Sequence, residues 1–474
     1  MELISDVCVL KYIIYLRENN IRLYLDDKKI KYKAMDGTSN KFISDFREYI
    51  GKNKNQFIKV LKNINTGIEL SPIQKSYILG MDTDCELGGT NCAYYIEYKI
   101  NNIDISRLEK IINELIYENE GLRCFFVDIN KYVIFDTFDK YKIKKLDNNL
   151  DYNEIRNLIF DKKYSYYDWP LFDFYVHKDS NSDDILYFIF NCIVLDAWSA
   201  NNLIKEIFYR YFLDIHKKIA STNYSIYKRK ESLYLDNLEM EEYHKYLSDE
   251  MKKYSIPELK YKRDFSEIRK VTFKRVCYEF TVKETKEIFS KLRLLGYTPT
   301  MYIATCYASF LAEASGEERS SIILTMNGRK NIIENENDII GEFSNIAVLN
   351  YTKSGNFCHD LKNIRNSILE ILEFIEYDGM ESFKYIKQNK LGQIVSPFVL
   401  TSVIEEDTIM EGFVTENYAI SKTPQVIIDH HIRLIRNSMV ISWDYVEELF
   451  EKEYIETLFN NYIKFLNNMK FNIL

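Results

Sequence analysis

The chain lacks the short glycine-rich motifs that hold phosphate groups in nucleotide-binding proteins. Neither G-x-x-x-x-G-K-[ST] nor G-x-G-x-x-G occurs in its 474 residues, so nucleotide chemistry has no support. Proline is also scarce, with 6 residues against 38 tyrosines. We attribute this bias to the codon usage of an AT-rich genome rather than to chemistry.

The cysteines and histidines show no pattern that is typical of a metal site or a disulfide framework. Eight cysteines are scattered without a C-x-x-C pair, so free thiols are expected. His430 and His431 are adjacent, and neighbouring residues on a strand point to opposite faces of a sheet. These two are therefore not expected to share a metal ion, and we predict no metal site.

The charge and hydropathy patterns exclude two kinds of large partner. The net charge is −8 and no long basic run occurs, so no nucleic-acid partner is expected. No apolar run reaches the length of a membrane span, and residues 1–6 lack the basic start of a signal peptide. The sequence predicts a soluble, cytoplasmic protein.

Residues 1–64 are predicted to form a separate small α+β module. A helical stripe of apolar residues precedes a strand over Ile21–Leu25, a turn at Asp26–Lys28 and a second strand over Lys29–Ala34. Two short helices follow, near residues 41–50 and 55–64. The second strand has an outer face of three lysines: Lys29, Lys31 and Lys33. This face is either simply solvated, the usual case, or a docking strip for an acidic peptide.

The rest of the chain is predicted to be a two-lobed α/β protein. Helical and strand patterns mix through two halves of similar size, residues 69–235 and 236–474. The second half contains a helix with Thr298 as its N-cap, Pro299 in its first turn and Gly316 just beyond its end. Four strands are predicted in the same half: Ser321–Met326, Pro397–Leu400, Pro424–His430 and Met439–Trp443. No repeat at a short fixed period occurs.

One segment has the pattern of a site. An apolar run over Ile185–Phe190 leads into Asn191-Cys-Ile-Val-Leu-Asp196-Ala-Trp-Ser199, and a helical pattern follows with Ser199 as its candidate N-cap. Polar residues that merely cap a helix after a strand would produce the same local pattern. The two interpretations are distinguished only by the rest of the chain.

The N-terminal module resembles the docking domains of multi-enzyme assembly lines, of the tubulysin-synthetase type. The resemblance runs through "NNIRLYLDDKKIKYKAMDGT" to the final helices. It implies that the β-hairpin captures the C-terminal tail of an upstream synthetase, and that the module often dimerises. The candidate docking residues are Tyr24, Lys29, Lys31 and Lys33.

From Leu70 onward the chain resembles heterocyclization domains, the specialised condensation domains of nonribosomal peptide synthetases. Seven motifs occur in order and together make chance a poor explanation. They are "LSPIQKSYILGMDTDCELGGTNCAYYIEY", "LEKIINELIYENEGLR", "WPLFDF", "TPTMYIATCYASFLAEAS", "LTMNGRK" with "IIGEFSN", "PFVLTS", and "SKTPQVIIDHH" with "ISWDYVEELF".

This resemblance implies a chloramphenicol-acetyltransferase-like fold with two lobes in a V and a tunnel between them. Phosphopantetheine arms of donor and acceptor carrier proteins would enter the tunnel from opposite faces, and no cofactor would be bound directly. The reaction would join an upstream acyl thioester to a carrier-bound Cys, Ser or Thr. Cyclisation with loss of water would then give a thiazoline or oxazoline.

The resemblance also implies which residues perform the chemistry. Cyclodehydration needs a proton donor, and a carboxyl group in a poorly solvated tunnel has its pKa raised enough to serve. Asp429 is the candidate for this group, and Thr401 would position or relay the proton. Ser199, Asn327, Ser402 and Gln425 are candidates for lining or supporting the tunnel.

Asp196 is given a structural role, as the partner of Arg329 in an ion pair across the core. The chain departs from the family pattern D-x-x-x-x-D, because Asn191 stands where the first acid is expected. An amide cannot carry charge or exchange a proton. Cys192 takes the place of the second histidine of ordinary condensation domains, and we interpret it as a small buried residue rather than a nucleophile.

Three interpretations remain. The chain is a complete heterocyclase, or it performs only condensation or only cyclodehydration, or it is a non-catalytic scaffold that docks an upstream protein. The presence of both Thr401 and Asp429 argues against the third.

Overall fold

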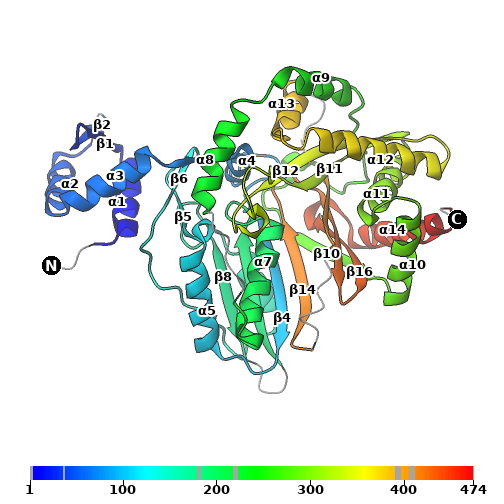
Figure 1. The fold of residues 1–474 in the computed structure, drawn as a ribbon, viewed down its shortest axis with the longest axis horizontal. Coiled ribbons are helices and arrows are strands. Elements are labelled where there is room, and N and C mark those ends of the chain that lie inside the picture. The colour runs from blue at the N-terminus through cyan, green and yellow to red at the C-terminus, as the bar shows by residue number, and fades with distance from the viewer. Residues whose placement is uncertain are drawn as a thin grey trace.

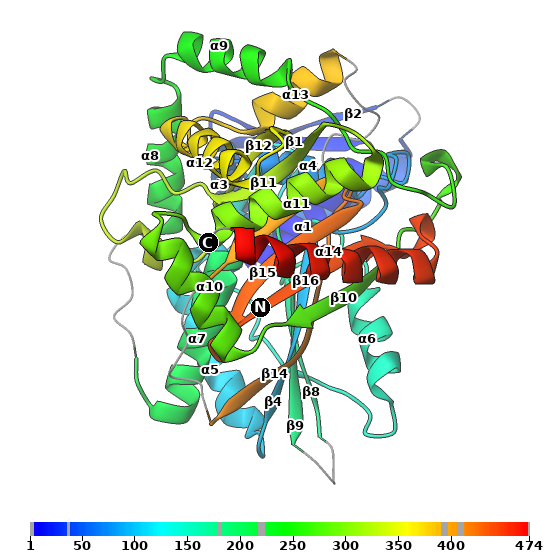
Figure 2. The same cartoon turned by 90° about the vertical axis from the view of Figure 1, so that its right-hand side faces the viewer.

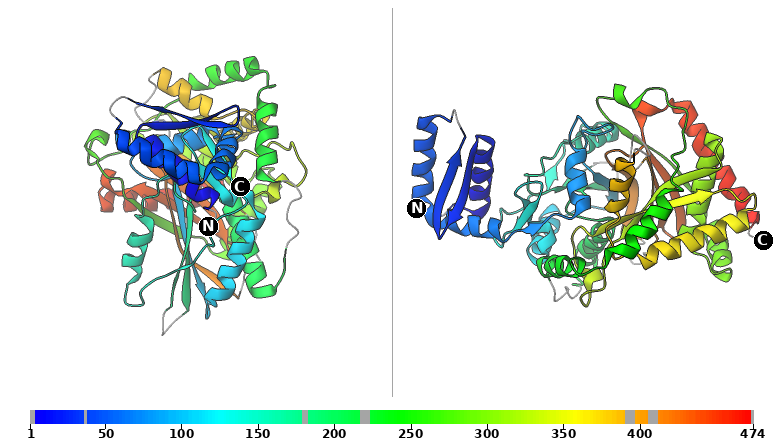
Figure 3. Two further views of the ribbon diagram at one scale, coloured as in Figure 1. Left: turned by 90° about the vertical axis from the view of Figure 1, so that its left-hand side faces the viewer. Right: turned by 90° about the horizontal axis from the view of Figure 1, so that it is seen from above.

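The computed structural model describes residues 4–35, 38–178, 183–216, 223–389, 397–404 and 412–472. In these residues the strands form two large sheets, one of six and one of five strands, together with a three-stranded and a two-stranded sheet. The large sheets belong to two lobes, and a small module projects from one end of the molecule (Figures 1 and 3).

The projecting module is a β-hairpin with three helices, as the sequence predicts. Asp27 and Lys28 form the turn, and both have positive φ angles, 43° and 66°, which suits the tight twist of a two-residue hairpin. The elements are α1 (Asp6–Glu18), β1 (Ile21–Asp26), β2 (Lys29–Ala34), α2 (Asn40–Lys52) and α3 (Lys54–Asn65).

The module shares a hydrophobic cluster with the first lobe. Apolar side chains of α1 and α3 pack against Phe125 and Val133 of the neighbouring three-stranded sheet and against Phe135, which follows the last strand of that sheet. Arg17 on α1 donates a hydrogen bond of 2.8 Å to the carbonyl oxygen of Val127. The module is therefore held on the lobe by the packing of its helices as well as by the chain connection.

The first lobe is built on the five-stranded sheet, in the order β14-β4-β9-β8-β7. Helices α5 and α7 cover one of its faces (Figure 1). The strands of this lobe and of the small sheet are β3 (Ile68–Glu69), β4 (Ala93–Ile100), β5 (Cys124–Phe126), β6 (Lys131–Ile134), β7 (Lys144–Lys145), β8 (Phe172–His177), β9 (Asp184–Asn191) and β14 (Val414–Lys422). Its helices are α4 (Pro72–Gly80), α5 (Ile105–Glu118), α6 (Tyr152–Phe160) and α7 (Ala197–Phe208).

The second lobe is built on the six-stranded sheet, in the order β10-β16-β15-β13-β11-β12, in which β11, β13 and β15 are parallel to one another. Helices α10, α11, α12 and α14 lie on the face turned to the viewer in Figure 2. The strands are β10 (Phe273–Glu279), β11 (Arg319–Asn327), β12 (Ser344–Thr352), β13 (Phe398–Val403), β15 (Ile428–Ile435) and β16 (Ser438–Val446). The helices are α9 (Met240–Met251), α10 (Val282–Leu294), α11 (Pro299–Ser315), α12 (Phe357–Glu373), α13 (Met380–Gln388) and α14 (Lys452–Asn472). The preceding helix α8 (Tyr224–Leu235) contacts β3 and packs into the hydrophobic cluster of the first lobe.

One strand links the two lobes. β14 follows β13 in the chain, yet it pairs antiparallel with β4 at the edge of the five-stranded sheet. The boundary between the lobes at residues 235 and 236 stays a prediction. β14 lies after this boundary in the chain, yet it belongs to the sheet of the first lobe. Because β14 pairs in the first lobe, the segment between β14 and β15 starts beside that lobe.

The end signals of α11 act as predicted, whereas two predicted boundaries are wrong. Thr298 caps α11, and Gly316 ends it with a φ of 74°. The helix after β9 is capped by Asp196, not by Ser199, because the Asp196 carboxylate accepts the Ser199 backbone N–H at 2.6 Å. The strand predicted from Pro424 begins only at Ile428, because Gln425 turns the backbone with a φ of 63°.

Candidate active site

A cavity of about 1550 Å³ is lined by residues of both lobes. Single small-molecule pockets have volumes of roughly 300–1,000 Å³, so this space is large enough for more than one tethered group. Six of the predicted site residues line it: Asp196, Asn327, Thr401, Ser402, Gln425 and Asp429. Asn191, Ser199 and Arg329 are buried beside the lining rather than in it.

Thr401 and Asp429 lie on adjacent parallel strands, β13 and β15. In the register of these strands Val399 pairs with Asp429, and Thr401 pairs with His431. The Thr401 hydroxyl donates a hydrogen bond of 3.3 Å to Asp429 Oδ1. The structure thus brings together the two residues to which the sequence assigns chemistry, while their roles stay a prediction.

Asp429 is also held from its other side. Its Oδ2 lies 2.8 Å from the Ser421 hydroxyl and 3.0 Å from His431 Nε2. The same imidazole nitrogen lies 3.3 Å from Oδ2 of Asp444. Asp444 in turn receives two hydrogen bonds from Arg275, of 2.6 and 2.7 Å.

The charges in this group are set by burial and by the neighbouring ions. Burial by itself lowers the pKa of His431, but the carboxylates of Asp429 and Asp444 outweigh burial and raise it. Burial by itself raises the pKa of Asp444, but the Arg275 guanidinium holds it well below its usual range. The arrangement therefore favours an imidazolium between two carboxylates.

The adjacent histidines point to opposite faces of the sheet, as predicted. His430 lies among aromatic rings on the helix-covered face, and its Nε2 is 2.8 Å from the Tyr462 hydroxyl. Burial lowers the pKa of His430 to about 3, so this imidazole is neutral. Alternation on a strand also places Asp429 and His431 on one face, a signal for the pair that the sequence prediction did not use.

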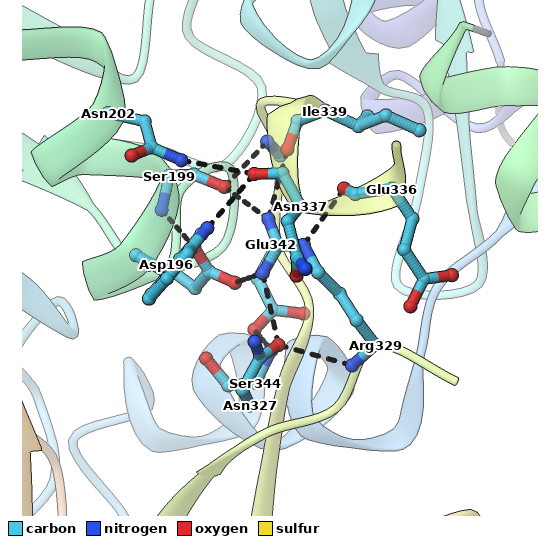
Figure 4. A network of polar contacts seen from close by, with 12 residues as sticks. Asp196, Ser199, Asn202, Asn327, Arg329, Glu336, Asn337, Ile339, Glu342 and Ser344 are labelled. Atoms are coloured by element: carbon cyan, nitrogen blue, oxygen red, sulfur yellow. Dashed lines mark hydrogen bonds and ion pairs between the residues drawn. The ribbon is translucent and has the colours of Figure 1, made fainter. Parts of the chain in front are cut away.

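The predicted ion pair between Asp196 and Arg329 is present, with 3.0 Å between Asp196 Oδ2 and Arg329 Nη1 (Figure 4). The guanidinium also donates to the Ser199 hydroxyl, to Asn327 Oδ1, and to the carbonyl oxygens of Glu336 and Ile339. It is thus fully enclosed by acceptors from both lobes.

Ser199 and Glu342 belong to the same polar cluster as Asp196 and Arg329. The Ser199 hydroxyl accepts the backbone N–H of Gly341 at 3.1 Å, so Ser199 joins α7 to the segment after β11. Glu342 is fully buried, and burial raises its pKa to about 7. Its Oε1 accepts the Ser344 backbone N–H, whereas Oε2 has no hydrogen-bond partner among the described residues. The sequence prediction did not identify Glu342.

Asn191 stabilises the backbone turn at the end of β9. Its side-chain oxygen accepts the backbone N–H of Ile193 at 3.0 Å and so forms a turn of the backbone. Cys192 is half-buried rather than fully buried as predicted, because it lines the cavity beside Cys92. Contact with the Cys92 side chain and burial raise the pKa of Cys192 well above its ordinary value, which keeps it a thiol and argues against a nucleophile.

Ser402 lines the cavity from β13, and Gln425 lines it from the turn before β15. The Ser402 hydroxyl lies 2.8 Å from the hydroxyl of Thr300 at the start of α11. The backbone N–H of Gln425 donates to the carbonyl oxygen of Leu87, in the glycine-containing segment of the first lobe. Both residues therefore fix the cavity wall between segments that are far apart in the sequence.

The candidate docking residues lie on the hairpin of the small module. Lys29, Lys31 and Lys33 are exposed on β2, and Lys31 forms an ion pair with Asp26 across the turn. Tyr24 pairs with Lys31 in the strand register and is half-buried. The lysines therefore face solvent, and their proposed partner stays a prediction.

Within the ranges of the chain given above, no group of three or more His, Cys, Asp or Glu side chains has an arrangement that could hold a metal ion. No helix in those ranges is long and apolar enough to cross a membrane.

Known proteins resemble the chain along most of its length. The family of condensation domains matches residues 64–472. Bacitracin synthase 1 of Bacillus licheniformis is 26% identical over 424 residues, and pyochelin synthetase PchE of Pseudomonas aeruginosa is 20% identical over 433 residues. Each alignment covers 85% of this chain, but only 8% and 29% of the respective relative. The chain thus spans less than a third of these proteins.

The fold has a match in a solved structure, the EpoB cyclization-docking bidomain of the nonribosomal peptide synthetase from Sorangium cellulosum. The TM-score is 0.77 at 19% identity, and the superposition covers 98% of this chain and 99% of that one. The predicted two-lobed fold with a small N-terminal α+β module is confirmed.

Proposed function

We propose that this chain, which belongs to the condensation-domain family, is a heterocyclization domain. It condenses a carrier-bound acyl or peptidyl thioester with a carrier-bound Cys, Ser or Thr, and then cyclodehydrates the amide to a thiazoline or oxazoline. The observation that carries the second step is the Thr401–Asp429 hydrogen bond on the wall of the cavity between the lobes.

The names of similar proteins support the same assignment. Several curated relatives are phenyloxazoline synthases, one of which is 24% identical over 179 residues. The solved bidomain with the same fold is described as a cyclization and docking unit. These names describe other proteins. They support cyclisation as the reaction type and do not identify the substrate of this chain.

Amide formation in this proposal depends mainly on orientation. Both reactants are tethered to phosphopantetheine arms of partner carrier proteins, and no further cofactor is needed. Holding two reactants in a suitable geometry replaces a bimolecular encounter, which supplies about 7–11 kcal/mol of the barrier in favourable cases. The cavity volume of about 1550 Å³ is consistent with two such arms and their acyl groups.

Cyclodehydration requires proton transfer as well. The side-chain sulfur or oxygen of the acceptor adds to the amide carbonyl carbon, and its proton moves to the carbonyl oxygen. The resulting hydroxyl group leaves as water when it accepts a proton, while the amide nitrogen loses its hydrogen and forms the C=N bond. In this proposal Asp429 exchanges these protons and Thr401 orients its Oδ1, which the hydrogen bond between the two side chains supports.

The small module completes the proposal as a docking unit. The exposed lysines of β2, Lys29, Lys31 and Lys33, lie along one strand and suit an acidic C-terminal tail of an upstream synthetase. Tyr24 on the paired strand lies beside them. Dimerisation through this module belongs to the same proposal.

The test is a reconstitution with purified carrier proteins, one loaded with an acyl donor and the other with cysteine. The mass of the carrier-bound product is followed over time. Loss of one water beyond the linear amide supports the complete reaction. A linear amide alone would show a condensation domain without cyclodehydration, and no transfer at all would favour a docking scaffold.

Asp429→Asn and Thr401→Val provide the matched variants of this assay. We expect Asp429→Asn to slow heterocycle formation by about 100-fold or more, because a carboxyl group that exchanges protons is replaced by an amide. The linear amide should still accumulate. Thr401→Val keeps the shape of the side chain and should have a smaller effect in the same direction.

A further inference from the structure

His431 lies in the cavity wall next to the residue to which we assign proton transfer. It lines the cavity together with Asp429, Ser421 and Thr401. Its side chain is almost fully buried, yet three polar atoms surround its Nε2: Asp429 Oδ2 at 3.0 Å, Ser421 Oγ at 3.0 Å and Asp444 Oδ2 at 3.3 Å. A structural histidine in a core needs one partner for this nitrogen, whereas here two carboxylates converge on it.

The second carboxylate does not depend on His431. Asp444 is fully buried on β16, and Arg275 on β10 donates to both of its oxygens. The Ser421 backbone N–H adds a third hydrogen bond of 2.7 Å. Because Arg275 already satisfies Asp444, removal of His431 leaves no unpaired carboxylate at this position.

The first carboxylate has a different environment. The contacts of Asp429 are made by hydroxyl groups of Thr401 and Ser421 and by the His431 imidazole. Among its hydrogen-bond partners in the described residues, His431 is therefore the only group able to carry a positive charge. Its Nε2, 3.0 Å from Asp429 Oδ2, is therefore the one cationic proton donor among these partners.

We propose that His431 is the proton store of the site and acts through Asp429. Its Nε2–H passes a proton to Asp429 Oδ2, and Asp429 delivers a proton to the hydroxyl group that leaves as water. The proton released from the amide nitrogen, when the C=N bond forms, returns through Asp429 to the neutral imidazole. One proton is delivered and one is recovered in each cycle, so no external acid is consumed.

Other charged groups face the imidazole and set the conditions under which it holds its proton. Asp429 belongs to the same strand, Asp444 to β16, Arg275 to β10, and the Tyr94 ring on β4 lies 5.9 Å away. The raised pKa described above agrees with this surrounding. His431 in this arrangement is a positioning and relay residue, since it reaches the substrate only through Asp429.

The inference rests on the proposed function and is tested in the same reconstituted assay. His431→Gln retains a polar side chain but cannot store a proton. We expect heterocycle formation to slow by about 100-fold, in the usual range for general acid–base catalysis, while linear amide formation changes less than about twofold. His177→Gln is the matched control, because His177 is a buried histidine of β8 outside the cavity.

The pH profile distinguishes a relay from a structural role. In the wild-type protein, heterocycle formation should fall as pH rises through the raised pKa of His431, and this limb should be absent in His431→Gln. Nuclear magnetic resonance of the full chain supplies a second measurement, since only six histidines occur in the sequence. The signal lost in His431→Gln should titrate above the ordinary histidine value in the wild-type protein.

Three outcomes overturn the inference. Equal pH profiles in wild type and His431→Gln, or an imidazole signal that titrates below the ordinary value, would remove His431 from the reaction while leaving the proposed function intact. A wild-type protein that forms only the linear amide would refute the proposed function and the relay together. The product mass therefore separates the two failures.

Discussion

Two carboxylates line the same cavity and are equally buried, yet they differ in what surrounds them. Asp196 is 6% exposed and Asp429 is 5% exposed, so burial does not distinguish them. Asp196 meets a guanidinium whose donors are all occupied by acceptors from both lobes. Asp429 meets two hydroxyl groups and an imidazole. The permanent charge of Arg329 suits an ion pair that stabilises the fold. The titratable imidazole of His431 suits proton transfer.

The largest expected effect on stability is that of Asp196→Ala. The substitution removes the N-cap of α7 and leaves Arg329 buried without its counter-ion, which should lower the free energy of unfolding by about 3–5 kcal/mol. Chemical denaturation measures this change. Asp196→Asn keeps the capping oxygen and should lose less. An Asp196→Ala variant with unchanged stability and no activity would instead assign Asp196 a direct part in the chemistry.

Glu342, beside Asp196, should make the stability of the molecule depend on pH. Below pH 4.5 its carboxyl group is neutral in the folded and unfolded chains alike. Between pH 4.5 and about 7 the unfolded chain loses the proton that the folded protein retains, so folding becomes less favourable as pH rises. Above pH 7 the loss amounts to about 3 kcal/mol.

Glu342→Gln removes this dependence and is the matched variant. We expect it to be more stable than the wild-type protein at pH 8 and to lose that advantage at pH 4.5, as measured by urea denaturation at both values. If the two proteins keep the same difference at every pH, an unidentified partner stabilises the charged form of Glu342. The surroundings of Asp196 and Glu342 would then stabilise negative charge better than the hydrogen bonds given above indicate.

The smallest effect is expected from Asn191→Asp. Asn191 lies outside the cavity lining, and its side-chain oxygen accepts one backbone N–H, a task that a carboxylate performs equally well. The rate of heterocycle formation should therefore change less than about threefold. The reconstituted assay measures it directly. A large gain in rate would show that the first acid of the family pattern takes part in the reaction.

Local signals in the sequence predicted the elements of the small module and the helix α11. The cap residues of α11, the two-residue turn of the hairpin and the apolar stripes of the small module all act over a few residues. Two boundaries failed where a local signal was ambiguous. Ser199 has the chemistry of an N-cap, but Asp196 takes that position and leaves the Ser199 hydroxyl to Arg329.

The candidate site was predicted in part, and mostly through the resemblance of its motifs to a family. Composition and spacing alone do not join Thr401 to Asp429, because parallel strands meet only when the sheet is formed. His431 and Glu342 escaped prediction for a related reason. Their chemistry depends on burial and on neighbours from other strands, and no pattern in their own segments reports these neighbours.

The hairpin and the caps of α11 depend on contacts between residues close in the chain, so the sequence predicts them. Tertiary structure alone decided which polar residues meet. Asp196 and Arg329 are 133 positions apart, and Asp444 reaches His431 because β15 and β16 pair in one register. Whether a buried carboxylate holds the fold or exchanges a proton follows from the cation opposite to it, and only the folded chain supplies that cation.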